Sequence, residues 1–175
     1  EDPKAWNAGN VQSVGGGCLV VGDKLFFYCS GRTMQPADSG ATGLVTMRRD
    51  GFASMDAGDV QGSLTTKLLR FSGSNLFVNL DSPKGELKVE VVDEKGKVLE
   101  DFSREKCLPL VGDGTKLMVR WHGGKDLSSL AGKPVRLRFY LTSGSLYSFW
   151  VGDAKGASNG YVGAGGPGFK GNLDK

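Results

Sequence analysis

The chain has 175 residues, 39% of them hydrophobic, and a net charge of +3 from 22 basic and 19 acidic side chains. This length supports one good core and a small appendage. The mixed charge excludes the basic footprint of a nucleic-acid-binding protein, and no apolar run approaches the roughly 18 residues of a membrane span. The chain opens on Glu-Asp-Pro, so any export signal is expected to lie outside it.

The first third of the chain predicts three strands. Residues 1–17 form a polar, Gly-rich lead-in without periodicity. CLVVGDKLFFYCSGR at 18–32 places two short β-branched and aromatic runs around Gly22-Asp23, which predicts a β-hairpin. TMQPADSG at 33–40 has the composition of a loop, and TGLVTMRR at 42–49 predicts a third strand.

A domain boundary is expected near Gly51, where the pattern of the sequence changes. FASMDAGDVQGSLTTKLLRF at 52–71 predicts two strands. SGSNLFVNLD at 72–81 predicts another, because apolar and polar side chains alternate along it. Turn residues bound that strand at Ser72-Gly73 and at 83–85, so it is expected to end there.

The next segment predicts a hairpin, a further strand and one short helical turn. GELKVEVVDEKGKVLEDF at 85–102 alternates on both sides of a Glu-Lys-Gly turn, which is typical of a hairpin. TKLMVRW at 115–121 predicts a strand with Leu117, Val119 and Trp121 on one face. DLSSLA at 126–131 is the stretch with a helical pattern, and its Asp is suited to cap it.

The stretch GKPVRLRFYLTSGSLYSFWV at 132–151 predicts the centre of the domain. Four apolar residues alternate with three polar or amphipathic ones on its first half, the period of a strand with one buried face. A Thr-Ser-Gly-Ser turn and a second apolar run then predict a central antiparallel hairpin. The inward residues on the first half are Val135, Leu137, Phe139 and Leu141.

Many short strands separated by Gly, Asp and Pro turns predict an all-β fold. We expect an antiparallel β-sandwich of the jelly-roll or lectin-like kind, preceded by an N-terminal β-hairpin segment. The predicted organisation is an N-terminal segment at 1–50, a sandwich domain at 51–152 and a Gly-rich extended tail at 153–175. Tyr161 and Phe169 are candidates for pinning that tail to a surface.

Three runs of the sequence carry a family resemblance. They are GLVTMRRDGFASMDAG, then SLTTKLLRFSGSNLFVNLDSPKGELKVEVVDEKGKVLEDFS, and finally WHGGKDLSSLAGKPVRLRFYLTSGSLYSFWV. Together they resemble the C-terminal β-sandwich of glycoside hydrolases related to family 32, the invertase and inulinase group, over about two thirds of the chain. The preceding GNVQSVGGGCLVVGDKLFFYCSGR looks like the last propeller blade before such a sandwich.

The resemblance implies a partner and a location. In that family a five-bladed β-propeller carries the catalysis, and the sandwich packs beside it. The family's catalytic carboxylates lie in Asn-Asp-Pro, Arg-Asp-Pro and Glu-Cys motifs on earlier blades, and none of these motifs occurs here. The resemblance therefore implies a non-catalytic part of a glycoside hydrolase, partnered with a catalytic propeller and located in an extracellular or periplasmic compartment.

The residues themselves offer little for catalysis or metal binding. Most carboxylates sit in predicted turns, and His122 is the single histidine. Cys18, Cys29 and Cys107 match no zinc pattern, and a Cys18–Cys29 disulfide is open but not favoured, because the thiols of such a hairpin lie about two residues out of register. Asp113, between two glycines, is a weak calcium candidate, and a plain turn is preferred. No cofactor is expected.

Two clusters are candidates for carbohydrate binding, which combines an aromatic face with polar side chains. The first is Trp121 with His122 and Lys125, and the second is Trp6 with Asn10. Trp121 is also in phase with core positions, so its burial is the competing interpretation.

Three functional hypotheses follow. The first is a non-catalytic accessory β-sandwich of a glycoside hydrolase that stabilises the catalytic propeller and binds a polysaccharide or oligosaccharide. The second is a fragment of a complete glycoside hydrolase. The third is an independent carbohydrate-binding module, which predicts binding without any partner domain.

Overall fold

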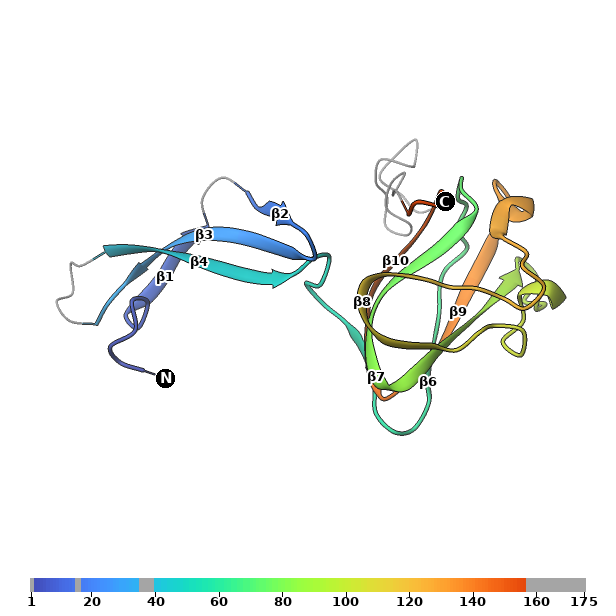
Figure 1. Cartoon of the computed structure of the whole chain (residues 1–175), viewed down its shortest axis with the longest axis horizontal. Helices are drawn as coiled ribbons and strands as arrows, with labels where there is room; N and C mark the ends of the chain where they lie inside the picture. Colours follow the sequence, from blue (N-terminus) through green and yellow to red (C-terminus); the bar gives the residue numbers. More distant parts are fainter. Residues whose placement is uncertain (1, 15–16, 35–39, 157–175) are drawn as a thin grey trace. The chain divides into compact units, whose positions relative to one another are not determined.

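A computed structural model describes residues 2–14, 17–34 and 40–156 of the chain. The chain is divided into two compact units, Glu1–Phe52 and Ala53–Lys175 (Figure 1). All sheets are antiparallel, and the helical elements among the described residues are two short 3-10 turns. The prediction of an all-β antiparallel fold is confirmed. The expected tail lies largely outside the described residues, as do Tyr161 and Phe169.

The N-terminal unit is a small antiparallel sheet built around one central strand. Its strands are β1 (Asn10–Val14), β2 (Leu19–Val21), β3 (Lys24–Arg32) and β4 (Gly40–Arg48). β4 pairs with the whole length of β3, whereas β1 and β2 share the opposite edge of β3, one at each end. The predicted β2–β3 hairpin and the third strand are both present.

The C-terminal unit contains a second antiparallel sheet of six strands. They are β5 (Met55–Ala57), β6 (Gly62–Thr65), β7 (Asn75–Asp93), β8 (Leu110–Met118), β9 (Val135–Thr142) and β10 (Gly144–Gly152). Their order is β5-β10-β7-β9-β6, and β8 pairs with β7. Two 3-10 turns, η1 (Glu100–Phe102) and η2 (Leu127–Leu130), lie in the connections.

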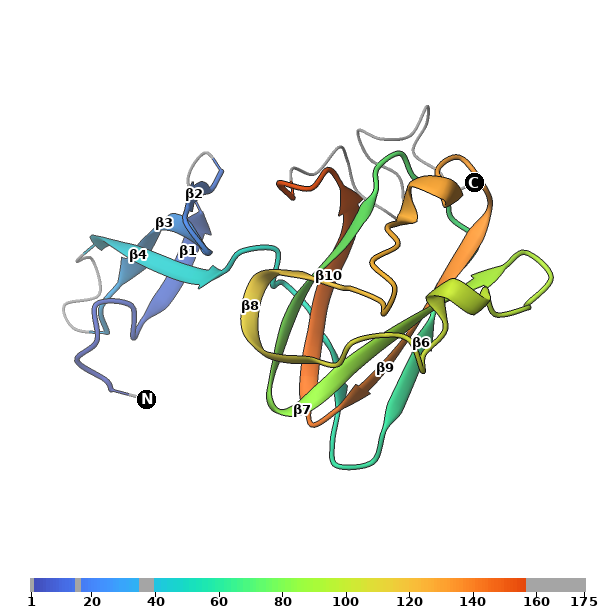
Figure 2. The ribbon, with the colours of Figure 1, turned by 45° about the vertical axis from the view of Figure 1, so that its right-hand side comes forward.

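The expected central hairpin at 132–151 is not formed. β9 and β10 do not pair with each other; both pair with β7, one after the other along the same side. β9 matches residues 86–93 of β7, and β10 matches residues 75–81. Residues 135–152 thus act as one long bent strand antiparallel to β7 (Figures 1 and 2). The expected end of a strand before 83–85 is wrong for the same reason, because β7 continues through that segment.

Glycine allows the bend where these long strands come close together. A Cβ atom added to Gly85 would overlap the carbonyl oxygen of Thr142, and one added to Gly144 would lie 2.7 Å from the carbonyl oxygen of Asp81. Only residues without side chains fit two backbones at this separation. The Ser-Gly sequence that resembles a turn is therefore a bend that lets both strands curve together.

The bend encloses a single core. Buried side chains from both halves of β7 meet those of β9 and β10, with Phe139 only 1% exposed. On β7 the inward positions change from even to odd numbers across the bend. The predicted inward face of β9 is confirmed, and the fully buried large side chains include Leu76, Leu80, Leu87, Leu127, Leu137 and Phe139.

Three local predictions need correction. The strand expected after the turn at Glu94–Gly96 is reduced to a single bridge between Val92 and Val98, followed by η1. The strand expected at 115–121 begins earlier and ends at Met118. Asp113 lies within β8, opposite Asp81, and not in a plain turn.

The structure contains the predicted cap of η2 and the predicted burial of two of the three cysteines. The Asp126 side chain accepts a hydrogen bond of 3.0 Å from the backbone N–H of Ser128 at the start of η2, as expected for a cap. All three cysteines are free thiols, with Cys29 and Cys107 buried. Cys18 is exposed, so the interpretation of all three as buried small hydrophobes is wrong for Cys18.

Candidate functional site

Trp121, the leading sequence candidate for sugar stacking, is a core residue. It is 3% exposed, and its indole Nε1 donates a hydrogen bond of 3.0 Å to the carbonyl oxygen of Val89. The ring also meets Phe102 edge-on, with centroids 5.4 Å apart. A ring that is buried to this extent is not available to stack on a sugar. The interpretation of Trp121 as a core residue is therefore confirmed, and its candidate role in sugar stacking is corrected to a structural one.

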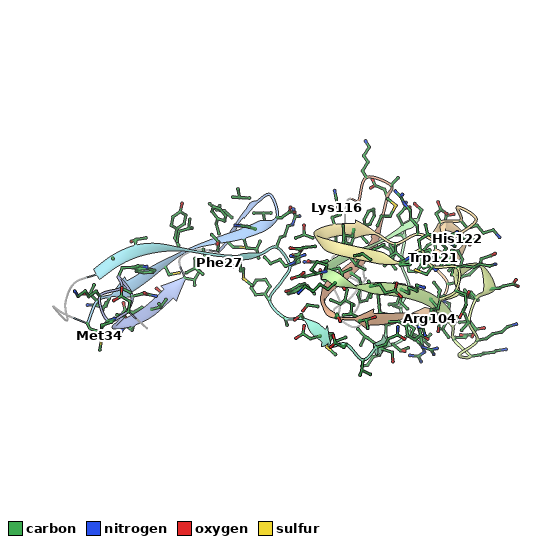
Figure 3. The ribbon with its side chains drawn as sticks, turned by 60° about the horizontal axis from the view of Figure 1, so that its bottom comes forward. Phe27, Met34, Arg104, Lys116, Trp121 and His122 are labelled. Atoms are coloured by element: carbon green, nitrogen blue, oxygen red, sulfur yellow. The ribbon has the colours of Figure 1, made fainter. Side chains whose placement is uncertain are left out.

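The residues that follow Trp121 reach the surface at once. Residues 122–126 are exposed and line a hollow of about 450 Å³ together with Trp121. Figure 3 labels Trp121 and His122 in the second unit. Gly123 and Gly124 have φ of +92° and +67°, a backbone that favours glycine and that turns the chain sharply here. The hollow thus contains His122 and Lys125, two of the predicted site residues, beside the buried Trp121.

Further residues line this hollow from segments that the sequence did not indicate. Ser74 and Asn75 come from the start of β7, and the amide of Asn75 donates a hydrogen bond of 2.8 Å to the hydroxyl of Ser74. Arg120 precedes the buried Trp121 and is exposed. The sequence pattern that could have indicated Arg120 is the alternation of apolar and polar residues at 119–122. This alternation places Arg120 and His122 on the same outer side.

Lys125 belongs to a small charge network at the edge of the hollow. Its Nζ lies 2.6 Å from Oδ2 of Asp101, and Lys106 Nζ lies 3.7 Å from the other oxygen of that carboxyl. The hydrogen bond from Lys125 holds the pKa of Asp101 below its usual range. Asp126 also has a lowered pKa, because the hydroxyl and the N–H of Ser128 donate to it. Both carboxylates near the hollow are therefore already engaged.

Trp6 and Asn10, the second predicted cluster, lie at one end of the N-terminal sheet. Asn10 is exposed and pairs with Arg32 across β1 and β3. Trp6 is half-buried, and its ring lies against Gly31 and Gly43, where an added Cβ atom would overlap it. One face of the Trp6 ring is thus in contact with the sheet.

The N-terminal sheet has apolar side chains on both faces. Residues opposite each other in antiparallel strands share a face, so the register assigns each side chain. The Cys29 face comprises Val11, Val14, Val20, Leu25, Phe27, Cys29, Val45 and Met47. The Tyr28 face carries the apolar residues Leu19, Val21, Phe26, Tyr28 and Leu44.

Many of these side chains are exposed (Figure 3). Val20 on the Cys29 face is 55% exposed, and Tyr28 on the other face is 53% exposed. Isolated exposed apolar side chains are ordinary, but contiguous sets on a surface mark interaction sites. Both faces of this sheet meet that description.

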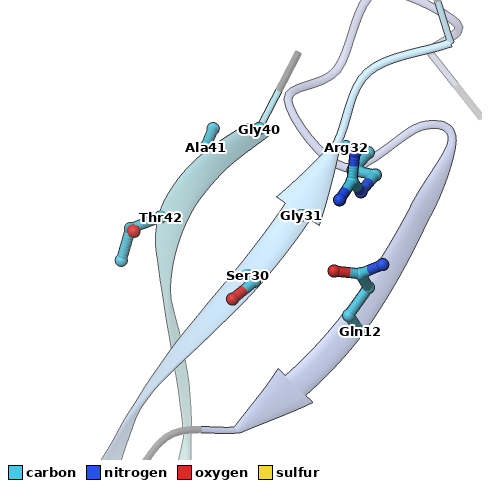
Figure 4. Close-up of a pocket in the computed structure, with 7 residues that line it drawn as sticks. All are labelled: Gln12, Ser30, Gly31, Arg32, Gly40, Ala41 and Thr42. Carbon is cyan, nitrogen blue, oxygen red and sulfur yellow. The ribbon is translucent and has the colours of Figure 1, made fainter. Parts of the chain in front are cut away.

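A polar hollow of about 320 Å³ interrupts the Tyr28 face at one end (Figure 4). Gln12, Ser30 and Thr42 come from three adjacent strands, with Ser30 directly opposite Thr42, and Arg32 lies beside them. Glycine and alanine at 31, 40 and 41 leave the space open. The lining is hydroxyl-rich but shallow, so it adds polar contacts at the edge of a largely apolar face.

One buried carboxylate, Glu90, lies in the second unit. Glu90 is 5% exposed, Arg138 Nη1 lies 2.7 Å from its Oε1, and the hydroxyl of Tyr140 donates to the same oxygen at 2.9 Å. The Arg104 guanidinium lies 4.4 Å from the centre of the Tyr140 ring. Glu90 is thus paired with Arg138 and Tyr140 within a cross-strand network.

No protein-family model matches the chain, and no curated protein or solved structure matches it. In the described ranges 2–14, 17–34 and 40–156, no three His, Cys, Asp or Glu side chains cluster closely enough to hold a metal ion. The same part of the chain contains no helix long and apolar enough to cross a membrane.

Proposed function

We propose that this chain is the non-catalytic accessory part of a glycoside hydrolase and that it docks through its N-terminal sheet onto a catalytic β-propeller. The observation that carries the proposal is the sheet of residues 10–48, whose two faces both expose apolar side chains. A sheet on the surface of a globular protein needs only one apolar face. A sheet packed between two others, as in a propeller, needs two.

We expect the partner surface to be a β-sheet, because the exposed side chains of the N-terminal sheet are of the kind that packs between two sheets. Val20, Val45 and Leu44 are β-branched or branched aliphatic residues, all between 43% and 55% exposed. Such side chains interdigitate with those of a second sheet about 10 Å away. Removal of this apolar surface from water favours the association.

The catalytic carboxylates are expected on the partner. Glycoside hydrolysis requires two carboxyl groups about 5 to 10 Å apart on either side of the sugar. The buried carboxylate Glu90 is held by Arg138 and Tyr140, and Asp101 and Asp126 are engaged in surface contacts. These arrangements support an accessory role.

The docking proposal is tested with the catalytic propeller of a family 32 invertase prepared without its last blade and without its own sandwich. The purified chain and this propeller are mixed, and the mass of the complex is measured by size-exclusion chromatography with light scattering. We expect a one-to-one complex. Val45→Lys on the Cys29 face and Tyr28→Lys on the Tyr28 face should each abolish it.

Lys67→Glu is the matched control, because Lys67 is exposed in the other unit. This variant should form the complex normally. No complex, or a complex that survives both sheet variants, would contradict docking through the sheet. Release of sugar from a fructan or an aryl glycoside by the chain alone would contradict the non-catalytic assignment.

Carbohydrate binding is the second candidate function, and the hollow beside His122 favours it. Its volume of about 450 Å³ falls within the range of about 300–1,000 Å³ found for small-ligand sites. Binding of a saccharide by the chain without any propeller would support the independent binding module as the alternative.

A further inference from the structure

The hollow beside Trp121 combines an apolar floor with a basic rim. The buried residues Leu76, Val119 and Trp121 line it. Arg120, His122 and Lys125 line it with exposed side chains. Apolar C–H surface below and charged or polar groups around it form the pattern of a site for a polar ring compound.

The basic side chains of the rim differ in whether they have an ion-pair partner. Lys125 is held by Asp101 at 2.6 Å. Within the part of the chain that the structure describes, the Arg120 guanidinium contacts only the sulfur of Met118, at 3.4 Å, and has no carboxylate partner. The His122 ring likewise has no ion pair among the described residues. Two cationic or protonatable groups on one rim therefore face solvent without a counter-charge.

The nearby carboxylates do not supply that counter-charge. Asp101 is bound by Lys125 and lies 3.7 Å from Lys106. Asp126 lines the hollow, but one of its oxygens accepts the N–H and the hydroxyl of Ser128 at the start of η2. Asp126 keeps its negative charge, so the hollow as a whole carries no positive excess, but Asp126 forms no ion pair with Arg120. The Arg120 guanidinium is therefore still able to pair with an external anion.

We propose that this hollow binds an acidic sugar residue, through a carboxylate or a sulfate ester group. This proposal rests on the carbohydrate-binding function proposed above. A guanidinium presents paired N–H donors that match the two oxygens of either group. His122 adds a third polar contact, and Ser74 and Asn75, which also line the hollow, are available to bond sugar hydroxyls.

An acidic sugar is favoured over a neutral one for a physical reason. Neutral sugars are held mainly by stacking on exposed aromatic rings, and Trp121, the aromatic residue of this hollow, is 3% exposed. A charge-assisted contact is roughly twice as strong as a neutral one, so it is suited to replace the missing stacking. Arg120 is then the residue that determines selectivity.

The test measures binding of three small saccharides to the full chain by isothermal titration calorimetry. Trigalacturonate supplies carboxylates, galactose 6-sulfate supplies a sulfate ester, and inulotriose is the neutral comparison. We expect binding of at least one acidic probe and weaker binding of inulotriose. Arg120→Gln should weaken the acidic probe about tenfold, and His122→Gln should weaken it by a smaller factor.

Lys67→Gln is the matched control, because it removes one positive charge from an exposed position outside the hollow. It should change the affinity less than twofold. A thermal melt of each variant confirms folding. Selective binding of trigalacturonate or of galactose 6-sulfate identifies the anionic group, and either result supports the proposal.

Three outcomes would overturn it. Equal binding of inulotriose removes the acidic selectivity but leaves carbohydrate binding in place. Equal weakening by Arg120→Gln and Lys67→Gln shows attraction to the overall charge and no site. Failure of all three probes removes the site, while the propeller complex still tests the docking function independently.

Discussion

The indole Nε1 of Trp121 is joined to the carbonyl oxygen of Val89 by a hydrogen bond of 3.0 Å. The N–H of the same Val89 lies 3.2 Å from the sulfur of Cys107. Val89 sits in the long strand β7, so these two contacts fasten the segments at 107 and 121 to the centre of the sheet. They also position the exposed rim that begins at His122.

Removing the Trp121 hydrogen bond should destabilise the second unit. Trp121→Phe keeps an aromatic ring but leaves the Val89 carbonyl without this donor, at an expected cost of about 1–3 kcal/mol in the free energy of unfolding. Trp150→Phe is the control, because the Nε1 of half-buried Trp150 makes a longer bond of 3.3 Å to Gly156. Urea unfolding measures both, and an equal loss in the two variants would argue against the structural role of Trp121.

The bend between the two halves of β7 makes a sharp steric prediction. Gly85→Ala places a Cβ atom on the carbonyl oxygen of Thr142, so the paired strands must separate, at a cost of about 3 kcal/mol or more. At Gly62 a Cβ atom would meet only Ala57, at an ordinary 3.5 Å. Gly62→Ala should therefore change stability by less than about 0.5 kcal/mol. Urea melts that show the same midpoint for both variants would contradict the close approach at Gly85.

The sequence indicated the alternating strands but not how they pair. Apolar alternation at Val135–Leu141 predicted the inward face of β9, because this period is local. Pro83 and Gly85 resemble a turn, and Ser143-Gly144 resembles another, so a strand end and a hairpin were predicted where two long strands bend together. Local turn chemistry does not distinguish a reversal from a bend, because the difference lies in which distant backbone passes alongside.

The candidate site was predicted in part for a similar reason. His122 and Lys125 are adjacent in sequence to an aromatic residue and lie in the hollow. Ser74 and Asn75 come from a segment more than forty residues earlier in the chain. The β7–β8 pairing and the hydrogen bond from the Leu127 N–H to the Ser74 carbonyl bring them there. The burial of Trp121 followed from its phase with Val119, and the phase was the better guide than the residue type.

The Asp101–Lys125 contact predicts a dependence on pH. Its hydrogen bond lowers the folded-state pKa of Asp101 below that of the unfolded chain. The stability from this pair is therefore present at neutral pH and is lost as the pH falls through the folded-state pKa. Lys125→Gln should raise the Asp101 pKa toward its usual value and weaken this acid dependence.

A carboxyl-carbon NMR titration from about pH 2 to about pH 6 measures the Asp101 pKa directly, across the usual range of aspartate. Lys116→Gln is the control, because the Lys116 Nζ bonds a backbone carbonyl at Lys155 and no carboxylate. The Asp101 pKa should not change in that variant. An Asp101 pKa that stays equally low after Lys125→Gln would assign the shift to Lys106 instead.

The contact between Trp6 and the N-terminal sheet gives the last prediction. The Trp6 ring lies against Gly43 so closely that Gly43→Ala must displace it. We expect the variant to lose about 1–3 kcal/mol of stability in the first unit. Gly40→Ala is the matched control on the same strand, because a Cβ atom there meets no atom of the described residues within 4 Å.

Fluorine NMR of the chain labelled with fluorotryptophan separates Trp6 from the other two tryptophans. In Gly43→Ala the Trp6 resonance should move and broaden, while those of Trp121 and Trp150 in the other unit should stay in place. All three should be unchanged in Gly40→Ala. If the Trp6 resonance is unaffected by Gly43→Ala, the ring does not lie on the sheet. In that case Trp6 leaves that end of the Cys29 face open, and the apolar surface offered to the propeller is larger than described.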